Sequence, residues 1–401
     1  YFFIKYDIII FTFFNNLIGF IMKRIIILII LYTSVVIQLY CDTTVDFRLF
    51  TSSYAYNGEN TCWEYTRTTL TYFENFTAGD FDIQFNDLIN LKIGVSVFFP
   101  FTSELPKGIR FFPIVTMQIS NEYVSFRMGT LTGGHNLPAP IRDPLIDMTP
   151  VVRSTPDNTL IAKGPESYKY DEPFTHGFYE YGASFEWFKA GGKGELYMNW
   201  QIQHNAKHRE RFDVGVIYWL DFINLWTPYI ALHYWHNGGH EYPLVAGTPA
   251  ITENYTGAVG INSKQLSILY MMSYNIPDRD NNVTKFGHGL FLRGNIPVLN
   301  WFEIEPIAFV SFFYINRKHQ FISVEGDPFY RVPFYFGLNI KREFVFDNGI
   351  SLTLALNNGL FLTEDNKVGG RYDQELKFDF TYLVPVKKVT NPPAESEKIK
   401  V

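Results

Sequence analysis

The sequence predicts an all-β protein: a closed antiparallel transmembrane β-barrel of about 16 strands, with 18 strands as the alternative. Three kinds of observation predict it. Apolar and polar residues alternate with a period of two, the connections between these segments are short and long in turn, and aromatic residues are abundant. Aromatic and charged residues each make up 18% of the 401 residues, whereas an ordinary soluble domain carries about 25% charged residues.

The first 41 residues have the pattern of a secretory signal peptide preceded by a separate stretch. Met22-Lys23-Arg24 leads into an apolar run from Ile25 to Ile37, and a polar exit follows and ends at Cys41. A basic start, an apolar run of about 7–15 residues and a polar exit are typical of such a leader. The alternative is a pair of transmembrane helices, which is disfavoured because no later segment resembles a membrane helix.

The chain is therefore expected to contain four segments. Residues 1–21 are upstream translated sequence, 22–41 the signal peptide, 42–386 the transmembrane β-barrel, and 387–401 a disordered C-terminal tail. The tail is expected because Pro392-Pro393 and a run of charged residues cannot form a packed core. The two cysteines, Cys41 and Cys62, exclude a disulfide scaffold, and lipid attachment at Cys41 is left open.

The period of two is clearest near the C-terminus. There a polar face alternates with a mostly apolar one: Asp373, Glu375, Lys377, Asp379 and Thr381 against Gln374, Leu376, Phe378, Phe380 and Tyr382. Successive side chains of a strand point to opposite faces of the sheet. Segments 196–203, 332–341 and 350–357 show the same pattern, so we expect each of them to be a strand.

The connections between these strands fall into two classes. The short ones are 121–122, 190–194, 221–224, 262–264, 297–300 and 347–349. The long or strongly polar ones are 133–175, 204–211, 237–254, 276–283, 315–330 and 361–371. From residue 109 onward the two classes alternate, as they do in a barrel with tight periplasmic turns and longer outer loops.

A soluble β-sandwich would show the same alternation along each strand. Two features favour the barrel: the regular order of connections, which Greek-key crossovers would disturb, and large aromatic residues near strand ends, where membrane interfaces need them. Those residues are Trp187, Trp200, Trp219, Trp226, Trp301 and Tyr382. The leader, the aromatic strands and the connections together resemble Gram-negative outer-membrane porins and polysaccharide-linked barrels. The resemblance covers nearly all of the mature chain but only its architecture, so it assigns no functional residue.

If the apolar faces meet lipid, the polar faces line the barrel. The expected lumen residues are Arg127, Glu180, Glu186, Asn199, Gln201, Gln203, Arg211, Asp213, Arg293, Glu303, Glu305, Lys341, Asp373, Glu375, Lys377 and Asp379. Mixed charges of this kind could orient polar solutes, or could pair and fill the lumen. Arg142 and Asp143 are further pore candidates, because the loop 133–175 exceeds what a connection needs and could fold inward.

A group of histidines and aromatic residues is expected at the outer rim. Its members are His233, Trp235, His236 and His240, and we expect them to contact sugars or lipid headgroups. A zinc site needs three or four ligands in tetrahedral positions. Because His233 and His236 point to opposite faces of a strand, no metal and no cofactor is expected.

The sequence also excludes several classes of function. The net charge is −6 and no Lys/Arg-rich run occurs, which argues against nucleic-acid binding, and enzyme motifs are absent. We therefore expect a non-enzymatic outer-membrane barrel of a diderm bacterium, in contact with lipid and acting as a channel for small polar solutes. The alternative is a non-channel barrel that binds or helps export a surface polysaccharide. An outer-membrane enzyme is a weaker alternative, and oligomeric state is left open.

Overall fold

The computed structural model describes most of the strand-forming part of the chain. The described residues are 43–61, 70–100, 109–132, 136–138, 140–141, 179–189, 191–202, 210–220, 225–238, 251–279, 281–298, 302–312, 321–323, 330, 332–346, 349–363 and 366–389. The expected upstream sequence and signal peptide lie outside these ranges, as do residues 390–401. Among the described residues, no helix is long and apolar enough to cross a membrane.

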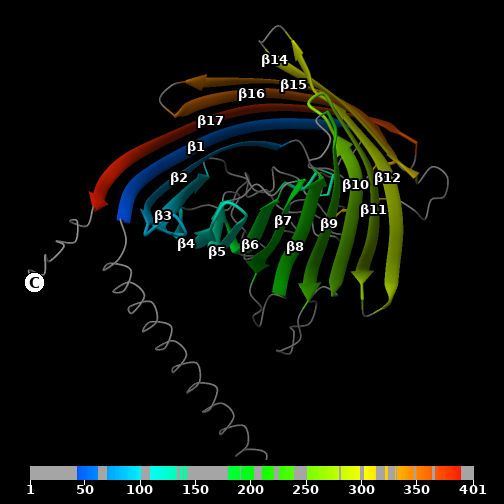
Figure 1. Ribbon diagram of the computed structural model, residues 1–401. Coiled ribbons are helices and arrows are strands. Elements are labelled where there is room, and N and C mark those ends of the chain that lie inside the picture. Colours follow the sequence, from blue (N-terminus) through cyan, green and yellow to red (C-terminus); the bar gives the residue numbers. More distant parts are fainter. Residues whose placement is uncertain are drawn as a thin grey trace, which may run out of the picture.

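Within the described ranges, seventeen strands make up the fold (Figure 1). They are β1 (Thr43–Thr61), β2 (Leu70–Gln84), β3 (Ile89–Pro100), β4 (Arg110–Ser120), β5 (Val124–Thr132), β6 (Tyr179–Lys189), β7 (Gly192–Ile202), β8 (Glu210–Leu220), β9 (Thr227–Gly238), β10 (Thr252–Asn262), β11 (Leu266–Asp278), β12 (Val283–Gly294), β13 (Ile296–Val298), β14 (Phe302–Ser311), β15 (Phe334–Phe346), β16 (Ile350–Leu362) and β17 (Val368–Val389).

The strands close into one antiparallel barrel. Apart from the short β13, each strand pairs with the strands before and after it, and β1 pairs with both β2 and β17, so that Tyr54 lies between Glu74 and Lys377. The three-residue β13 continues the edge of β12, because both pair with β14. The wall therefore has 16 strands, and the predicted architecture and strand number are confirmed. Closure gives each of these 16 described strands a partner on both sides, which is what a barrel in lipid requires.

Tight connections gather at one end of the barrel, which we call the turn end. The beginning of β1 and the end of β17, the two strands that close the barrel, also lie at this end, because Thr43 pairs with Val389. The Asn86 side chain accepts hydrogen bonds from the backbone amides of Leu88 and Ile89, at 2.8 and 2.7 Å, and Asn121 caps the next such turn in the same way. Such local side-chain bonds are what Asn contributes to turns.

The opposite end, which we call the loop end, is less uniform than predicted. Segments 276–283 and 361–371 were expected to be long loops, but the strands on either side continue almost to the tip. Only 279–282 connects β11 to β12, and only 363–367 connects β16 to β17. Asn282 and Asn366 have φ angles of 53° and 64°, a left-handed conformation that Asn tolerates well. The polar residues of these two segments therefore belong to tight turns and not to long loops.

Side chains separate cleanly between the two faces of the wall. The outward face carries exposed apolar residues on neighbouring strands, including Val95, Val115, Leu196, Leu232, Val259, Met272, Phe336, Leu354, Leu376 and Phe378. On the inward face the same strands present buried or polar side chains. A continuous exposed apolar surface of this kind is expected where the solvent is hydrocarbon.

Candidate functional site: the barrel lumen

One strand, β17, directs a row of charged side chains into the lumen. Arg371 and Lys377 form ion pairs with Asp373 and Asp379 two positions further along, the second at 2.8 Å. Between these pairs, Glu375 accepts a hydrogen bond from the Asn357 amide of β16. Alternate residues of a strand are about 6.6 Å apart, so the row runs along the wall from the loop end toward the turn end.

Ion pairs on the neighbouring strands extend this charged region. Near the turn end, Lys92 of β3 lies 3.5 Å from Asp82 of β2, with side-chain exposures of 25% and 29%. Arg127 of β5 pairs with Glu186 of β6, and both remain about a quarter exposed. Water therefore reaches these charges. We call the inward face of β17 and β1–β6 the charged half of the lumen.

Closer to the loop end, the charged half becomes buried. Arg48 of β1 donates two hydrogen bonds to one carboxylate oxygen of Asp80, at 3.0 and 2.7 Å, and Asp80 is fully buried. Asp373 is fully buried as well. The water-exposed charges of this half therefore lie nearer the turn end, and we call Asp82, Lys92, Arg127 and Glu186 the vestibule.

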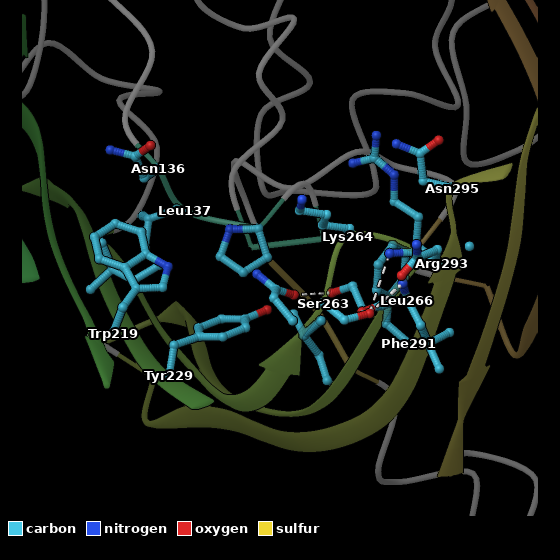
Figure 2. A pocket seen from close by; sticks show the side chains of 17 residues that line it. Asn136, Leu137, Trp219, Tyr229, Ser263, Lys264, Leu266, Phe291, Arg293 and Asn295 are labelled. Atoms are coloured by element: carbon cyan, nitrogen blue, oxygen red, sulfur yellow. Dashed lines mark hydrogen bonds between the residues drawn. The ribbon is translucent and has the colours of Figure 1, made fainter. Parts of the chain in front are cut away.

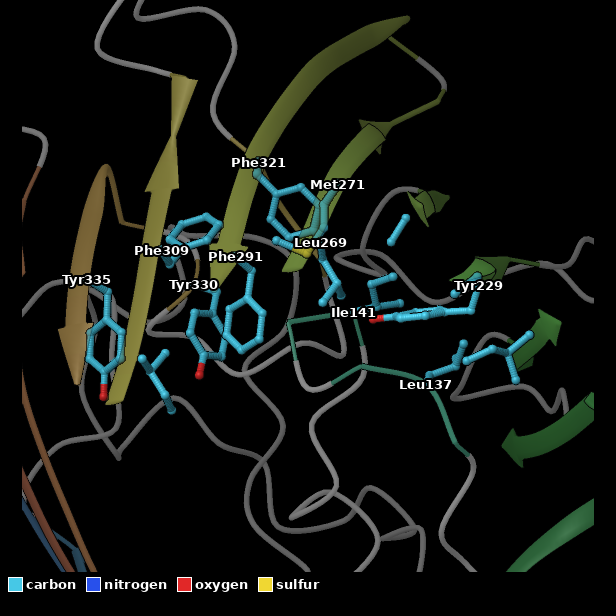
Figure 3. Close-up of a cluster of buried hydrophobic side chains, with 14 of the residues drawn as sticks. Leu137, Ile141, Tyr229, Leu269, Met271, Phe291, Phe309, Phe321, Tyr330 and Tyr335 are labelled. Carbon is cyan, nitrogen blue, oxygen red and sulfur yellow. The ribbon is translucent and has the colours of Figure 1, made fainter. Parts of the chain in front are cut away.

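The other half of the lumen, along β7–β12 and β14–β16, is filled by an apolar core (Figure 3). Wall residues meet residues from two connections that enter the barrel. The buried members are Leu137, Ile141, Tyr197, Ile217, Tyr229, Ala231, Ala258, Leu269, Met271, Phe291, Ile307, Phe309, Phe321, Tyr330, Val332, Tyr335 and Phe361. Burial of so many apolar side chains stabilises the inward position of both segments.

Hydrogen bonds fix the two inward segments to the wall and to each other. The backbone amide of Ile322 donates to Ser273 Oγ of β11 at 2.9 Å. The side-chain amide of Asn254 on β10 donates to the backbone carbonyl of Ile322 at 3.0 Å. In the other segment, the Asn136 side chain donates to Glu195 of β7 at 2.9 Å. Ser323 donates to the carbonyl of Ile141 and so joins the two segments. Part of the 133–175 connection does therefore fold inward.

A cavity of about 370 Å³ lies between the inward segment that contains Asn136 and Leu137 and the β10–β11 turn at the turn end (Figure 2). Trp219 and Tyr229 form part of its apolar wall, and Lys264 and Arg293 contribute cations. Arg293 is paired with Glu305 at 2.5 Å but keeps a side-chain exposure of 45%. The cavity thus combines aromatic surface with charged groups, as ligand pockets commonly do.

Two residues expected at the outer rim lie inside the barrel instead. His233 and Trp235 occupy inward positions of β9 and are almost fully buried, with His233 Nε2 3.4 Å from Asp213 Oδ2. Arg211 lies over the Trp235 ring at 5.9 Å. Of the three described members of the expected rim group, His236 alone faces outward, because it has the opposite strand parity, and its Nδ1 lies 3.1 Å from the Tyr234 hydroxyl. The rim expectation was wrong for the first two because strand parity, not nearness to a loop, sets the direction of a side chain.

The other expected lumen residues divide into two sets. On inward positions are Arg127, Glu186, Asn199, Arg211, Asp213, Arg293, Glu303, Glu305, Lys341, Asp373, Glu375, Lys377 and Asp379. Glu180 and Gln201 belong to β6 and β7 by their backbone, while Arg142, Asp143, Gln203 and His240 lie outside the described residues. A role of any of them in transport stays a prediction.

Sequence reasoning missed the charges on the first strands. Arg48, Asp80, Asp82 and Lys92 all face the lumen, and each sits at an even position of β1, β2 or β3 together with buried residues such as Ser52 and Ser96. The period of two could have found them. Within the described ranges, no group of three or more His, Cys, Asp or Glu side chains is placed to hold a metal ion.

Several solved outer-membrane proteins resemble this fold, although at low sequence identity. OccAB4 from Acinetobacter baumannii is 8% identical, with 86% of this chain and 99% of that chain covered and a TM-score of 0.38. OprB from Pseudomonas putida is 7% identical, with coverages of 85% and 94% and a TM-score of 0.44. OpdK from Pseudomonas aeruginosa is 7% identical, with coverages of 84% and 99% and a TM-score of 0.43. No protein-family model and no curated protein matches the chain.

Proposed function

We propose that the protein is an outer-membrane channel for small polar solutes. The observation that carries the proposal is the vestibule at the turn end, where oppositely charged side chains face the inside of a closed barrel and remain open to water. Lys92 with Asp82, and Arg127 with Glu186, show this combination of charge and exposure. A lumen that only had to be packed would not need exposed charges on its inner wall.

The two halves of the lumen suggest how such a channel would work. The apolar core occupies the side of β7–β12 and β14–β16, so a solute path would run off-centre along the charged half. The path would narrow toward the loop end, where Asp80 and Asp373 are buried. We therefore expect a small conductance and selection by charge and size, with no wide opening.

Planar-bilayer recording of the purified protein tests this function. We expect steady current steps, and we expect Lys92→Glu to shift the reversal potential in a salt gradient toward cation preference. Lys189→Glu is the matched control, because Lys189 is an exposed residue at the outward face of β6 near the turn end, and it should leave the reversal potential unchanged. Correctly folded protein that carries no current would overturn the channel proposal.

A second candidate is a non-channel barrel that binds or helps export a surface polysaccharide. The observation that favours it is the apolar core, which includes Phe321 and Tyr330 from a connection at the loop end and could close the lumen. The same recordings separate the two functions. A silent barrel that retains polysaccharide on an affinity column supports the second, and current blocked by small solutes supports the first.

A further inference from the structure

The strands β9, β10 and β11 lie side by side in the wall (Figure 1). On their outward face at the loop end, a polar cluster is formed by His236, Glu253, Tyr255 and Arg279, the last just after β11. Its centre is Glu253 of β10, whose side chain is only 9% exposed. The residue opposite it on β9 is His236. Both belong to the face that presents Leu232 and Val259 to hydrocarbon nearer the middle of the barrel. A buried carboxylate on this face needs compensating partners.

The partners of Glu253 hold one arginine in a fixed position. Arg279 Nη1 donates to Glu253 Oε1 at 2.9 Å, and the Tyr255 hydroxyl donates to Oε2 at 3.2 Å. His236 Nδ1 lies 3.6 Å from the first oxygen. The backbone amide of Arg279 also donates to the Ile251 carbonyl at 3.0 Å. The guanidinium is thereby oriented from one side.

The rest of the Arg279 guanidinium is accessible from outside the protein. Its side chain is 57% exposed, and within the part of the chain that the structure describes its other N–H groups have no hydrogen-bond partner. A guanidinium offers a planar fork of donors that suits phosphate oxygens. Because Glu253 already holds one edge of the guanidinium in place, little side-chain entropy would be lost when the other edge binds an anion.

Aromatic rings form a belt beside this arginine. The rings of Trp200, Phe212, Tyr234, Tyr255 and Tyr274 follow one another across β7–β11, with successive centroid separations of 5.6, 5.9, 4.7 and 6.3 Å. Trp and Tyr in such belts lie at the level of lipid headgroups. A ligand held by Arg279 would therefore contact both the guanidinium and the aromatic rings. A small free anion would contact the guanidinium alone.

We propose that Arg279 and this aromatic belt bind the phosphorylated sugar headgroup of a glycolipid in the outer leaflet. The phosphate lies on the guanidinium of Arg279, and the adjoining sugar and upper acyl chain lie against Tyr255 and Tyr274. The proposal goes beyond transport. It shares with the proposed function only the membrane location of the barrel, and it does not depend on whether the lumen conducts.

Binding of purified lipid A, a phosphorylated disaccharide glycolipid, to the detergent-solubilised barrel tests the proposal, with native mass spectrometry as the readout. We expect Arg279→Gln to weaken binding about ten-fold or more and Arg279→Lys to weaken it less, because Lys keeps the charge but loses the fork. Lys189→Gln removes a cation at the turn end and should bind as the parent does. A folded, heat-modifiable band on gels confirms that each variant is intact.

Two further binding measurements show which part of the lipid the protein recognises. Lipid A stripped of its phosphates should bind the parent protein as weakly as intact lipid A binds Arg279→Gln, and inorganic phosphate at equal concentration should not displace the intact lipid. Equal binding of both lipid forms, or of parent and Arg279→Gln, would overturn the proposal, as would full displacement by inorganic phosphate. The bilayer recordings are independent of these results, so failure of lipid binding and failure of the channel proposal are distinguishable.

Discussion

At the scale of single residues, strand parity decides whether an aromatic side chain meets lipid or the lumen. Trp200 occupies an outward position of β7 and is exposed, whereas Trp219 occupies an inward position of β8 and lines the cavity. Lys193, also inward, lies 5.2 Å from the Trp219 ring. Both tryptophans are near strand ends, and for that reason the sequence predicts both at the membrane interface. The inward position of Trp219 contradicts the prediction, whereas an interface position of Trp200 stays a prediction.

Fluorescence quenching by brominated lipid should separate the two tryptophans. In single-tryptophan variants reconstituted into vesicles, we expect strong quenching of Trp200, because bromine atoms reach outward side chains, and little quenching of Trp219. Equal quenching of both residues by brominated lipid would contradict the assigned faces.

Inward aromatic rings also depend on glycines in neighbouring strands. A Cβ atom on Gly215 of β8 would lie 2.1 Å from the Tyr197 ring of β7, which is almost fully buried. We expect Gly215→Ala to destabilise the barrel by about 1–3 kcal/mol, the usual cost of overpacking. Urea unfolding in lipid vesicles measures the change.

Gly257 provides the matched control for this substitution. It lies on the outward face of β10, where a Cβ would lie 3.2 Å from the exposed, flexible Leu232 side chain and in ordinary contact with the Ala231 carbonyl oxygen, at 3.7 Å. Gly257→Ala should be neutral or slightly stabilising, because alanine has the smaller conformational entropy to lose. If both variants lose the same stability, ring packing is not the reason for the glycine at 215.

At the scale of elements, the inward segments decide how much of the lumen is free. Residues 321–323 carry one buried aromatic side chain, Phe321, and are held to the wall by Ser273 and Asn254. Such contacts could not be derived from the sequence, because they join residues far apart in the chain. The signal available was only the excess length of the connections 133–175 and 315–330.

Removal of one wall contact should loosen the second inward segment. Ser273→Ala deletes the acceptor of the Ile322 amide, and one hydrogen bond contributes about 1 kcal/mol. We therefore expect hydrogen exchange at Ile322 to rise about five-fold. Ser184→Ala, which changes a buried inward serine on β6, should leave that amide unaffected. Unchanged exchange in Ser273→Ala would show that apolar packing alone fixes the segment.

At the scale of the whole molecule, alternation and connection order were enough to predict a closed 16-stranded barrel. Both follow from local chemistry: side chains alternate between two solvents, and turn residues such as Asn86 and Asn121 recur at one end. The same alternation placed Asp373 and Lys377 of β17 on the inward face. The division of the lumen into an apolar half and a charged half was not predictable, because it depends on which strands the two inward segments reach.

The division of the wall into a hydrocarbon face and an aqueous face is the claim on which the account rests. Spin labels placed one at a time at residues 374 to 379 of β17, in protein reconstituted into bilayers with the native cysteines replaced by serine, test it most directly. We expect collision with oxygen to dominate at 376 and 378, and collision with a water-soluble nickel chelate to dominate at 375, 377 and 379. Accessibility that did not alternate along the strand would contradict a lipid-embedded barrel with a polar lumen.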